Sequence, residues 1–214
     1  MNQFLTYMWF ISSGIVLTLQ LLAGSLTIGF ILGALIAILQ YLGIGKTIFN
    51  GFISIMRGTP VILQLSLIYF SAPGLLGIKF SVLSAGIITF GLNSAAYIAE
   101  ILRAGIQSLP KGQFEAAQTL QIPIWNTWKD IILPQVLQNI LPAMTNEIIL
   151  VLKETALIAT IGGIDIMRAS QMLAAEQFTY FMPLCIAGIY YYLLVLLIEY
   201  VAQKLEQRVQ YVKN

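Results

Sequence analysis

Charged residues are scarce in this chain: aspartate, glutamate, lysine and arginine make up 9% of its 214 residues. Soluble domains carry roughly 25% charged residues. Hydrophobic residues reach 58%, and the mean hydropathy is +0.86. So little charge cannot cover a surface that faces water, and lipid must therefore cover part of it. We expect an integral, multi-pass membrane protein with a single domain over residues 1–214.

Histidine is absent, and Cys185 is the single cysteine. These two facts exclude an intramolecular disulfide, a Cys/His zinc cluster and a His-based catalytic triad. No spacing of carboxylates indicates a metal site either. The net charge of +2 and the lack of a basic run exclude nucleic acid as an expected partner. The N-terminus lacks the positive region of a signal peptide, so we expect its apolar run to be a retained span.

Apolar stretches of membrane-spanning length occur five times. A bilayer core about 30 Å thick requires about 20 apolar residues per helix. We therefore expect five transmembrane helices, at about 11–39, 50–72, 82–106, 136–161 and 184–202. The first is longer than required, which predicts tilt or extension into the headgroups. Because five is an odd number, the termini are expected on opposite sides.

The distribution of positive charge predicts the orientation. One side of the expected spans holds only Lys79 and Arg168. The other side carries Lys46, Lys111, Lys129, Lys204, Arg208 and Lys213. This richer side is expected to be cytoplasmic, with the N-terminus outside and the C-terminus inside. The segment 110–134 then becomes the largest cytoplasmic loop.

This loop is too polar to span the membrane and too regularly patterned to be disordered. Residues 113–120 favour a helix, and Pro123 ends it. Trp125 and Trp128 share one face of a second short helix, and tryptophans beside a membrane usually lie at the headgroup level. We expect two short helices against the inner membrane surface.

The loop resembles the cytoplasmic signature of ABC importer permeases, which reads E-A-A, three residues, Gly, nine residues, Ile, one residue, Leu-Pro. Residues 115–117 match the E-A-A, and Ile131, Leu133 and Pro134 follow at the required spacing. Gln121 occupies the Gly position, where glycine would supply a tight turn between the short helices.

Four further segments are similar to the polar amino acid branch of these permeases, which carries histidine, glutamine or arginine. They are the R-G-T-P at 57–60 with Gln64, the N-S-A-A-Y-I-A-E at 93–100 with Arg103, the K-G-Q at 111–113 and the K-E-T-A-L at 153–157. Their order and their places relative to the expected spans make the resemblance specific over roughly positions 14 to 205.

The resemblance implies an all-α permease subunit of a type I ABC importer in the cell inner membrane. Two permease subunits, identical or paralogous, would pair around a central pathway, and an extracytoplasmic binding protein would deliver a polar amino acid. Two ATPase subunits would hold ATP and magnesium and contact the loop. This chain has no G-x-x-x-x-G-K-[ST] phosphate loop, so we expect it to bind no cofactor and not to be an enzyme. The residues implied in coupling are Gln113, Glu115, Ala116, Ala117 and Gln121.

Glu115 has two interpretations. It could be a capping charge that interacts with the N-terminal dipole of its short helix. Alternatively, Ala116 and Ala117 let a partner surface approach closely while Glu115 makes a polar contact.

The candidate pathway residues lie on the third and fourth expected spans. Intramembrane charges are costly and usually face a cavity or a partner. On the fourth span, Glu147 would stack with Glu154, and Asn146 with Lys153, since seven residues make about two helical turns. An ion pair that only joins helices is the alternative for Lys153 and Glu154. Glu147 is the preferred contact for an amino group. The hydrogen-bonding candidates, for which helix packing is the alternative, are Asn93, Ser94 and Tyr97.

Arg57, Glu100 and Arg103 lie toward the cytoplasmic ends of their spans. Glu100 and Arg103 could pair on one helix face, or Arg57 and Glu100 could form an inner gate or a brace for the loop. Two other functions remain open. An ATP-independent secondary transporter or channel would show an internal repeat, and none is visible. A membrane-embedded enzyme would need a catalytic constellation, for which only Glu147 with Glu154 could serve.

Overall fold

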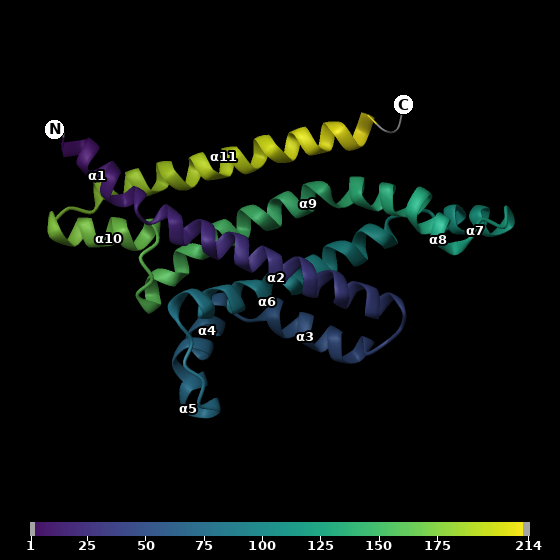
Figure 1. Cartoon of the computed structure of the whole chain (residues 1–214), viewed down its shortest axis with the longest axis horizontal. Coiled ribbons are helices and arrows are strands. Elements are labelled where there is room, and N and C mark those ends of the chain that lie inside the picture. The colour runs from purple at the N-terminus through teal and green to yellow at the C-terminus, as the bar shows by residue number, and fades with distance from the viewer. Residues whose placement is uncertain (1–2, 212–214) are drawn as a thin grey trace.

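The computed structural model describes residues 3–211, and every regular element in that range is helical. Four long helices lie side by side along the long axis: α2 (Ile15–Tyr41), α6 (Val82–Gln107), α9 (Leu133–Glu154) and α11 (Phe181–Tyr211) (Figure 1). Helices α2, α6 and α11 run in one direction, and α9 runs in the opposite direction (Figure 1). Helices α1 (Gln3–Ser12) and α10 (Ile166–Glu176) lie at one end. Helices α7 (Lys111–Thr119) and α8 (Ile124–Asn126) lie at the other, where α11 also ends. Lys213 lies outside the described residues.

The closest packing in the bundle is between α2 and α6. Glycines make it possible: a Cβ at Gly33 would lie 2.9 Å from the carbonyl oxygen of Ala95, and one at Gly91 would lie 3.3 Å from that of Ser25. Small residues let membrane helices approach until their backbones nearly touch. The α2–α6 pair is therefore the rigid centre against which the other helices pack.

The second expected span is not one helix. Residues 46–76 form α3 (Lys46–Gly58), α4 (Val61–Ser66), a π-helical turn (Leu67–Ser71) and α5 (Ala72–Leu76). The segments before and after Pro60 are bent by 102° relative to each other. Proline disfavours a helical conformation in the residue before it and has no N–H to donate, which explains the break. Arg57 thus lies in the last turn of α3, not near the start of a straight span.

The other expected boundaries also shift. The helical region of the first span starts at Gln3, well before residue 11, and is interrupted at Ser13 and Gly14. A Cβ on Gly14 would lie 2.2 Å from the backbone of Asp165, so the break lets α2 meet the start of α10. The fourth span starts at Leu133, and its α-helix ends at Glu154, where a 3-10 segment (Thr155–Ile161) begins.

Within residues 3–211, three helical stretches are long and apolar enough to cross a membrane, and a fourth is added if the bent pair counts as one span. The three are 4–41, α6 and 181–208. Helix α9 is not among them, because its faces carry Gln, Asn, Glu and Lys side chains. Five spans are therefore not confirmed by length and composition.

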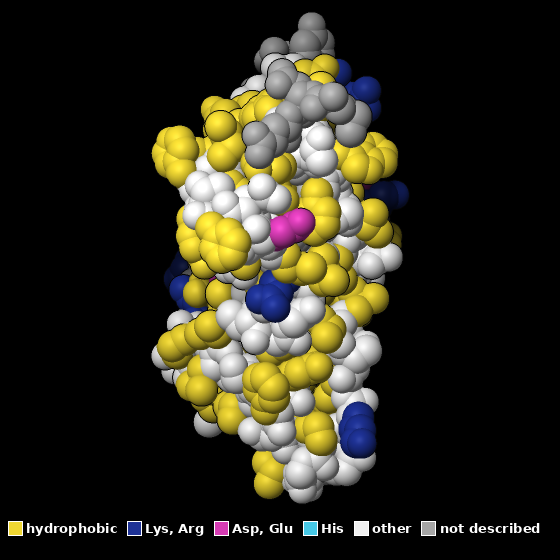
Figure 2. All heavy atoms as spheres, turned by 90° about the vertical axis from the view of Figure 1, so that its left-hand side faces the viewer, with side chains coloured by type: hydrophobic (Ala, Val, Ile, Leu, Met, Phe, Trp, Pro, Cys, Tyr) yellow, Lys and Arg dark blue, Asp and Glu magenta, His cyan; other side chains and the backbone are white. Residues whose placement is uncertain are grey.

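A buried carboxylate, that of Asp165, joins α10 to α11 at the end of the bundle that carries α10. Asp165 caps α10 by accepting the backbone N–H of Arg168 at 2.8 Å, and it also accepts the Tyr191 hydroxyl at 2.8 Å. Burial raises the pKa of Asp165 above its usual range. The contact with Arg168 is a backbone cap, not a side-chain ion pair. Figure 2 looks onto this end, where charged side chains are few and scattered among hydrophobic ones.

Candidate functional site: a buried polar cluster and an exposed loop helix

A carboxylate lies buried where α6 and α9 meet. Glu147 of α9 is 5% exposed, and its Oε1 accepts the hydroxyl of Ser94 from α6 at 2.7 Å. Gly29 of α2 lies against Ser94, where a Cβ would be 3.0 Å from its hydroxyl. The close approach of α2 thus holds Ser94 against Glu147. The structure also brings Arg57 into electrostatic reach of Glu147, a neighbour that the sequence spacing does not reveal.

Asn93 lies beside Ser94 in sequence but points to a different helix. Its Nδ2 donates to the carbonyl of Met56 in α3 at 2.9 Å. In an unbroken helix, this carbonyl would accept the N–H of residue 60, which is Pro60 and has none. Gln64 Nε2 donates to the same carbonyl at 3.0 Å and to Thr59 Oγ1 at 2.8 Å. Asn93 and Gln64 therefore replace the helical hydrogen bonds that are lost at the bend.

Arg57 connects the two sets of charged residues. Its guanidinium lies over the ring of Tyr97 at 5.1 Å from the centroid, and its Nη1 is 3.8 Å from Glu100 Oε1. Arg103 donates from Nε to Glu100 Oε2 at 2.9 Å. Both pairings expected for Glu100 thus occur together. The Glu100 carboxylate thus lies between two arginines, and Arg57 of α3 contacts both Glu100 and Tyr97 of α6.

The remaining pathway candidates divide between two faces of α9. Glu147 is buried and Glu154 is half-buried, whereas Asn146 and Lys153 are both exposed. This division agrees with the expected pairing of residues seven positions apart. The outer face with Asn146 and Lys153 is free to meet a partner or a water-filled path. Glu154 is the last residue of α9, so the polar stripe ends where the 3-10 segment begins.

The loop between α6 and α9 forms a short helix that protrudes from the bundle. Glu115 and Ala116 of α7 are exposed, while Ala117 is 2% exposed and packs within the chain. Gln113 is half-buried. Because α7 starts at Lys111, Glu115 lies beyond its first turn, and no acidic residue occupies that turn. The interpretation of Glu115 as a capping charge is therefore wrong.

Gln121 follows α7 in a left-handed conformation with φ of 54°. Glycine adopts this region without strain, and other residues adopt it at a cost. The chain thus keeps the tight turn that a glycine would make at this position. Ile122 then donates its N–H to the carbonyl of Ala117 at 3.0 Å and closes the end of α7.

Aromatic side chains fasten α7 to the bundle. Trp128, in the π-helical turn after α8 (Thr127–Ile132), contacts Phe114 of α7 edge to face, with ring centroids 6.0 Å apart. It contacts Tyr41 of α2 in the same way at 5.0 Å. Trp128 therefore contacts both α7 and α2.

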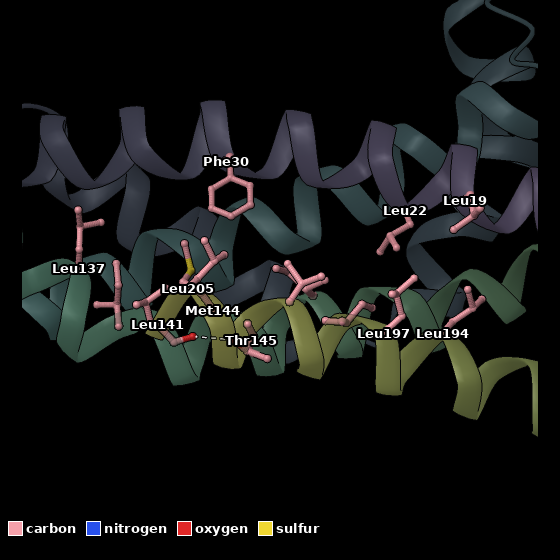
Figure 3. A pocket seen from close by; sticks show the side chains of 15 residues that line it. Leu19, Leu22, Phe30, Leu137, Leu141, Met144, Thr145, Leu194, Leu197 and Leu205 are labelled. Atoms are coloured by element: carbon pink, nitrogen blue, oxygen red, sulfur yellow. Dashed lines mark hydrogen bonds between the residues drawn. The ribbon is translucent and has the colours of Figure 1, made fainter. Parts of the chain in front are cut away.

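A long groove between α2, α9 and α11 encloses about 510 Å³ (Figure 3). Thr145 is its one polar lining side chain, and the hydroxyl donates to the Leu141 carbonyl at 3.0 Å. A zwitterionic solute would find no partner for its charges there. The groove is therefore separate from the polar cluster in chemistry, and it is not the candidate site.

Gln64 belongs to the site, although the sequence marks it only together with the R-G-T-P segment at 57–60. The sequence does indicate a role for Gln64. Because Pro60 has no N–H, the carbonyl four residues earlier loses its helical hydrogen bond, and a long amide side chain inside an apolar segment can donate to it instead. The part played by Trp128 had no such signal, because nothing in the sequence pairs it with Tyr41.

The sequence and the fold have known relatives. The family model described as "binding-protein-dependent transport system inner membrane component" matches residues 29–211. A putative glutamine transport system permease protein of Rickettsia typhi is 45% identical over 201 residues, which cover 93% of this chain and 92% of that protein. An arginine transport system permease protein of Bacillus subtilis is 39% identical over 203 residues, covering 94% and 93%.

Two solved structures resemble the fold. An amino acid ABC transporter crystallised with histidines has a chain that superposes with a TM-score of 0.87 at 35% identity, over 95% of this chain and 96% of that one. A methionine ABC transporter in an inward-facing conformation gives a TM-score of 0.79 at 20% identity, over 98% and 99%. The second likeness shows the fold alone.

Proposed function

Since the chain belongs to the family of binding-protein-dependent transport system inner membrane components, we propose that it is the permease subunit of an ATP-driven importer for polar L-amino acids. It is a multi-pass protein of the inner membrane, as its family and its apolar helices indicate. The names of its relatives point to glutamine or arginine as the substrate. In this proposal, the chain moves the substrate and partner ATPases bind ATP and magnesium.

The observation that carries the proposal is the form of α7. This short helix protrudes at one end of the bundle and exposes Glu115 and Ala116, while Phe114 and Ala117 anchor it from below. A small residue beside a carboxylate gives a partner a surface that it can approach closely and hydrogen-bond. The path from Phe114 through Trp128 to Tyr41 would carry the movement of an ATPase into α2.

We place the α7 end in the cytoplasm and the α10 end outside, with five crossings. The support is the positive-inside rule: Lys46, Lys111 and Lys129 belong to elements at the α7 end, and Arg168 belongs to α10. The bent segment α3–α4 and helix α9 would be the two crossings whose composition is too polar or too irregular for a length test. Such segments are tolerated where protein or water surrounds them.

Glu147 is the proposed contact for the substrate. A buried carboxylate attracts a cation strongly because little water screens it. The ammonium group of an amino acid, or a cationic side chain, would interact with Glu147 and be stabilised by the neighbouring Ser94. Exposed Lys153 and half-buried Glu154 would extend the polar path toward the outer end. A second permease subunit would supply the opposite wall, and an extracytoplasmic binding protein would deliver the substrate.

The test of this proposal is a charge reversal, Glu115→Lys, in the full chain expressed in its own membrane. We expect an ATPase subunit to co-purify with the unaltered chain in mild detergent and to be lost from the variant, and ATP-dependent uptake to stop. Glu206→Lys is the matched control: it reverses a charge near the end of α11, outside α7, and should keep both the ATPase and the uptake.

The alternative outcomes are informative. If the unaltered chain carries no ATPase and transports an amino acid in liposomes without ATP, the secondary transporter is right and the proposal is wrong. If Glu115→Lys retains the ATPase and full uptake, α7 is not the coupling element.

A further inference from the structure

Two neighbouring hollows at the α7 end share one wall. The first is an apolar groove of about 600 Å³ that lies between α2, α6 and the loop, lined among others by Ala34, Leu102 and Trp125. The second is a polar pocket of about 260 Å³ that contains Gln40, Lys46 and Asn50. Ala37, Tyr41 and Ile106 line both.

The apolar groove fits a hydrocarbon chain. Along α2 its lining runs from Ala34 to Tyr41, a distance of seven residue steps, or about 10 Å along the helix axis. Trp125 is 71% exposed at its rim, and Trp128 forms part of its wall. Tryptophan is enriched at the level where acyl chains meet headgroups. The groove thus has the depth and the position of the outer part of one leaflet.

The polar pocket carries positive charge and one unsatisfied acceptor. Lys46 is exposed at the start of α3, and Arg103 also lines the pocket. The Arg103 guanidinium is paired with both carboxylate oxygens of Glu100 and donates to Gln107 as well, so Lys46 is the less compensated of the two cations. Gln40 is 8% exposed and donates from Nε2 to Asn50 Oδ1 at 2.8 Å. Its buried Oε1 has no hydrogen-bond partner. A buried acceptor without a donor costs free energy, which marks this pocket as the polar part of the α7 end.

From this continuity we propose that the two hollows form one binding site for an anionic phospholipid of the leaflet at the α7 end. One acyl chain occupies the groove beside Trp125 and Trp128. The phosphate lies against Lys46 and Arg103.

The other large groove shows why charge selects this occupant. The groove between α2, α9 and α11 is equally apolar, but its lining contains no charged residue (Figure 3). This groove could hold any hydrocarbon chain, and it has no charge with which to distinguish anionic lipids from neutral ones. At the α7 end, the cationic pocket begins where the apolar wall ends, which is the arrangement of charge and chain in a lipid. This inference requires only that the chain lie in a membrane, and it does not depend on the amino acid carried.

The test uses fluorescence of the full chain reconstituted in bilayers. The sequence has three tryptophans, so a Trp9→Phe variant keeps Trp125 and Trp128, which both line the groove. Brominated acyl chains quench indole fluorescence on contact. We expect brominated phosphatidylglycerol to quench this variant more strongly than brominated phosphatidylcholine at equal mole fraction.

Lys46→Gln should then lower the preference for phosphatidylglycerol about fivefold, the effect of one basic residue beside an anionic headgroup. Lys111→Gln is the matched control, since Lys111 is an exposed lysine of the same end that lines neither hollow. It should change the preference by less than about twofold, because an exposed charge is screened.

Three outcomes would overturn the proposal. The two lipids could quench equally, or Lys46→Gln and Lys111→Gln could lower the preference equally, which would mean diffuse attraction only. Excess inorganic phosphate could abolish the preference, which would assign the pocket to a free anion. Native mass spectrometry of the chain should independently show phosphatidylglycerol adducts that decline in Lys46→Gln and persist in Lys111→Gln.

Discussion

Helices α6 and α11 both pass a length and composition test for crossing a membrane, but they differ in where their side chains lie. In the most apolar window of α6, 61% of the residues are buried inside the protein, whereas the corresponding window of α11 is 17% buried. Helix α6 is the less hydrophobic of the two. Its interior residues include Thr89, Asn93 and Ser94, while α11 faces outward with leucines and tyrosines.

This comparison shows that a helix that packs mainly against protein needs less hydropathy than a helix that exposes most of its side chains. A helix surrounded by protein can carry polar groups, since other side chains satisfy them. Helix α9 follows the same trend. It carries Glu147, and it is not apolar enough to count as a membrane-crossing helix by length and composition. In this chain, the less hydrophobic helices α6 and α9 hold the candidate site, whereas the more hydrophobic α11 exposes most of its side chains.

The largest effect is expected from matched glycine substitutions. At Gly33, a Cβ would lie 2.9 Å from the Ala95 carbonyl oxygen and 2.8 Å from Ile98, so Gly33→Leu must separate α2 from α6. Overpacking of this kind costs about 3 kcal/mol. At Gly188 of α11 nothing lies within 4 Å, so Gly188→Leu should not destabilise the chain and should raise stability slightly, since leucine favours a helix more than glycine does. Thermal unfolding in detergent measures both, and equal melting temperatures would show that α6 and α11 are packed alike.

A second pair compares carboxylates. Glu147→Gln removes the buried charge on the α6 side, and we expect substrate affinity to fall about 30-fold, since a lost contact to a buried charge costs about 2 kcal/mol. Glu199→Gln on the exposed surface of α11 should not change it. Uptake by reconstituted vesicles at increasing substrate concentrations measures this affinity. Similar losses in both variants, or in neither, would remove Glu147 from the pathway.

The smallest effect is expected in the turn after α7, which lies outside both α6 and α11. Gln121→Gly relieves a left-handed conformation but also loosens the unfolded chain, so a net stabilisation of about 0.5 kcal/mol is expected. Gln118→Gly, in the exposed interior of α7, should instead destabilise the helix by about 1 kcal/mol. Hydrogen exchange of α7 amides measures both. Faster exchange in Gln121→Gly would show that the glutamine side chain stabilises the turn.

Sequence patterns predicted the all-helical fold and the short loop helix, because these follow from apolar run length and helix breakers. The contact between Ser94 and Glu147 was foreseen only as two separate candidates. It depends on how Gly29 and Gly33 let α2 approach α6, and sequence spacing does not show which helices meet. Asn93 and Ser94 were named together as hydrogen-bonding candidates, but they contact different helices, because a step of one residue turns a side chain by about 100°.

The angle of the bend at Pro60 could not be predicted from the sequence either. The sequence marks the break, because proline ends a helix, but the angle depends on which donors replace the lost hydrogen bonds. Two of these donors come from Asn93 and Gln64, the first of which is 37 residues away from Met56. Long-range partners of this kind are set by packing.

The doubly satisfied carbonyl of Met56 has a mechanical consequence. In hydrocarbon, a freed backbone oxygen is costly, so any rotation of α3 against α4 must carry both amide donors along or admit water. One donor belongs to α4 and the other to α6, the helix that also holds Ser94 against Glu147. The bend between α3 and α4 is therefore stiff. A force applied to α3 would be passed to α6 without a change in the bend angle, and the three helices would move together as one rigid unit.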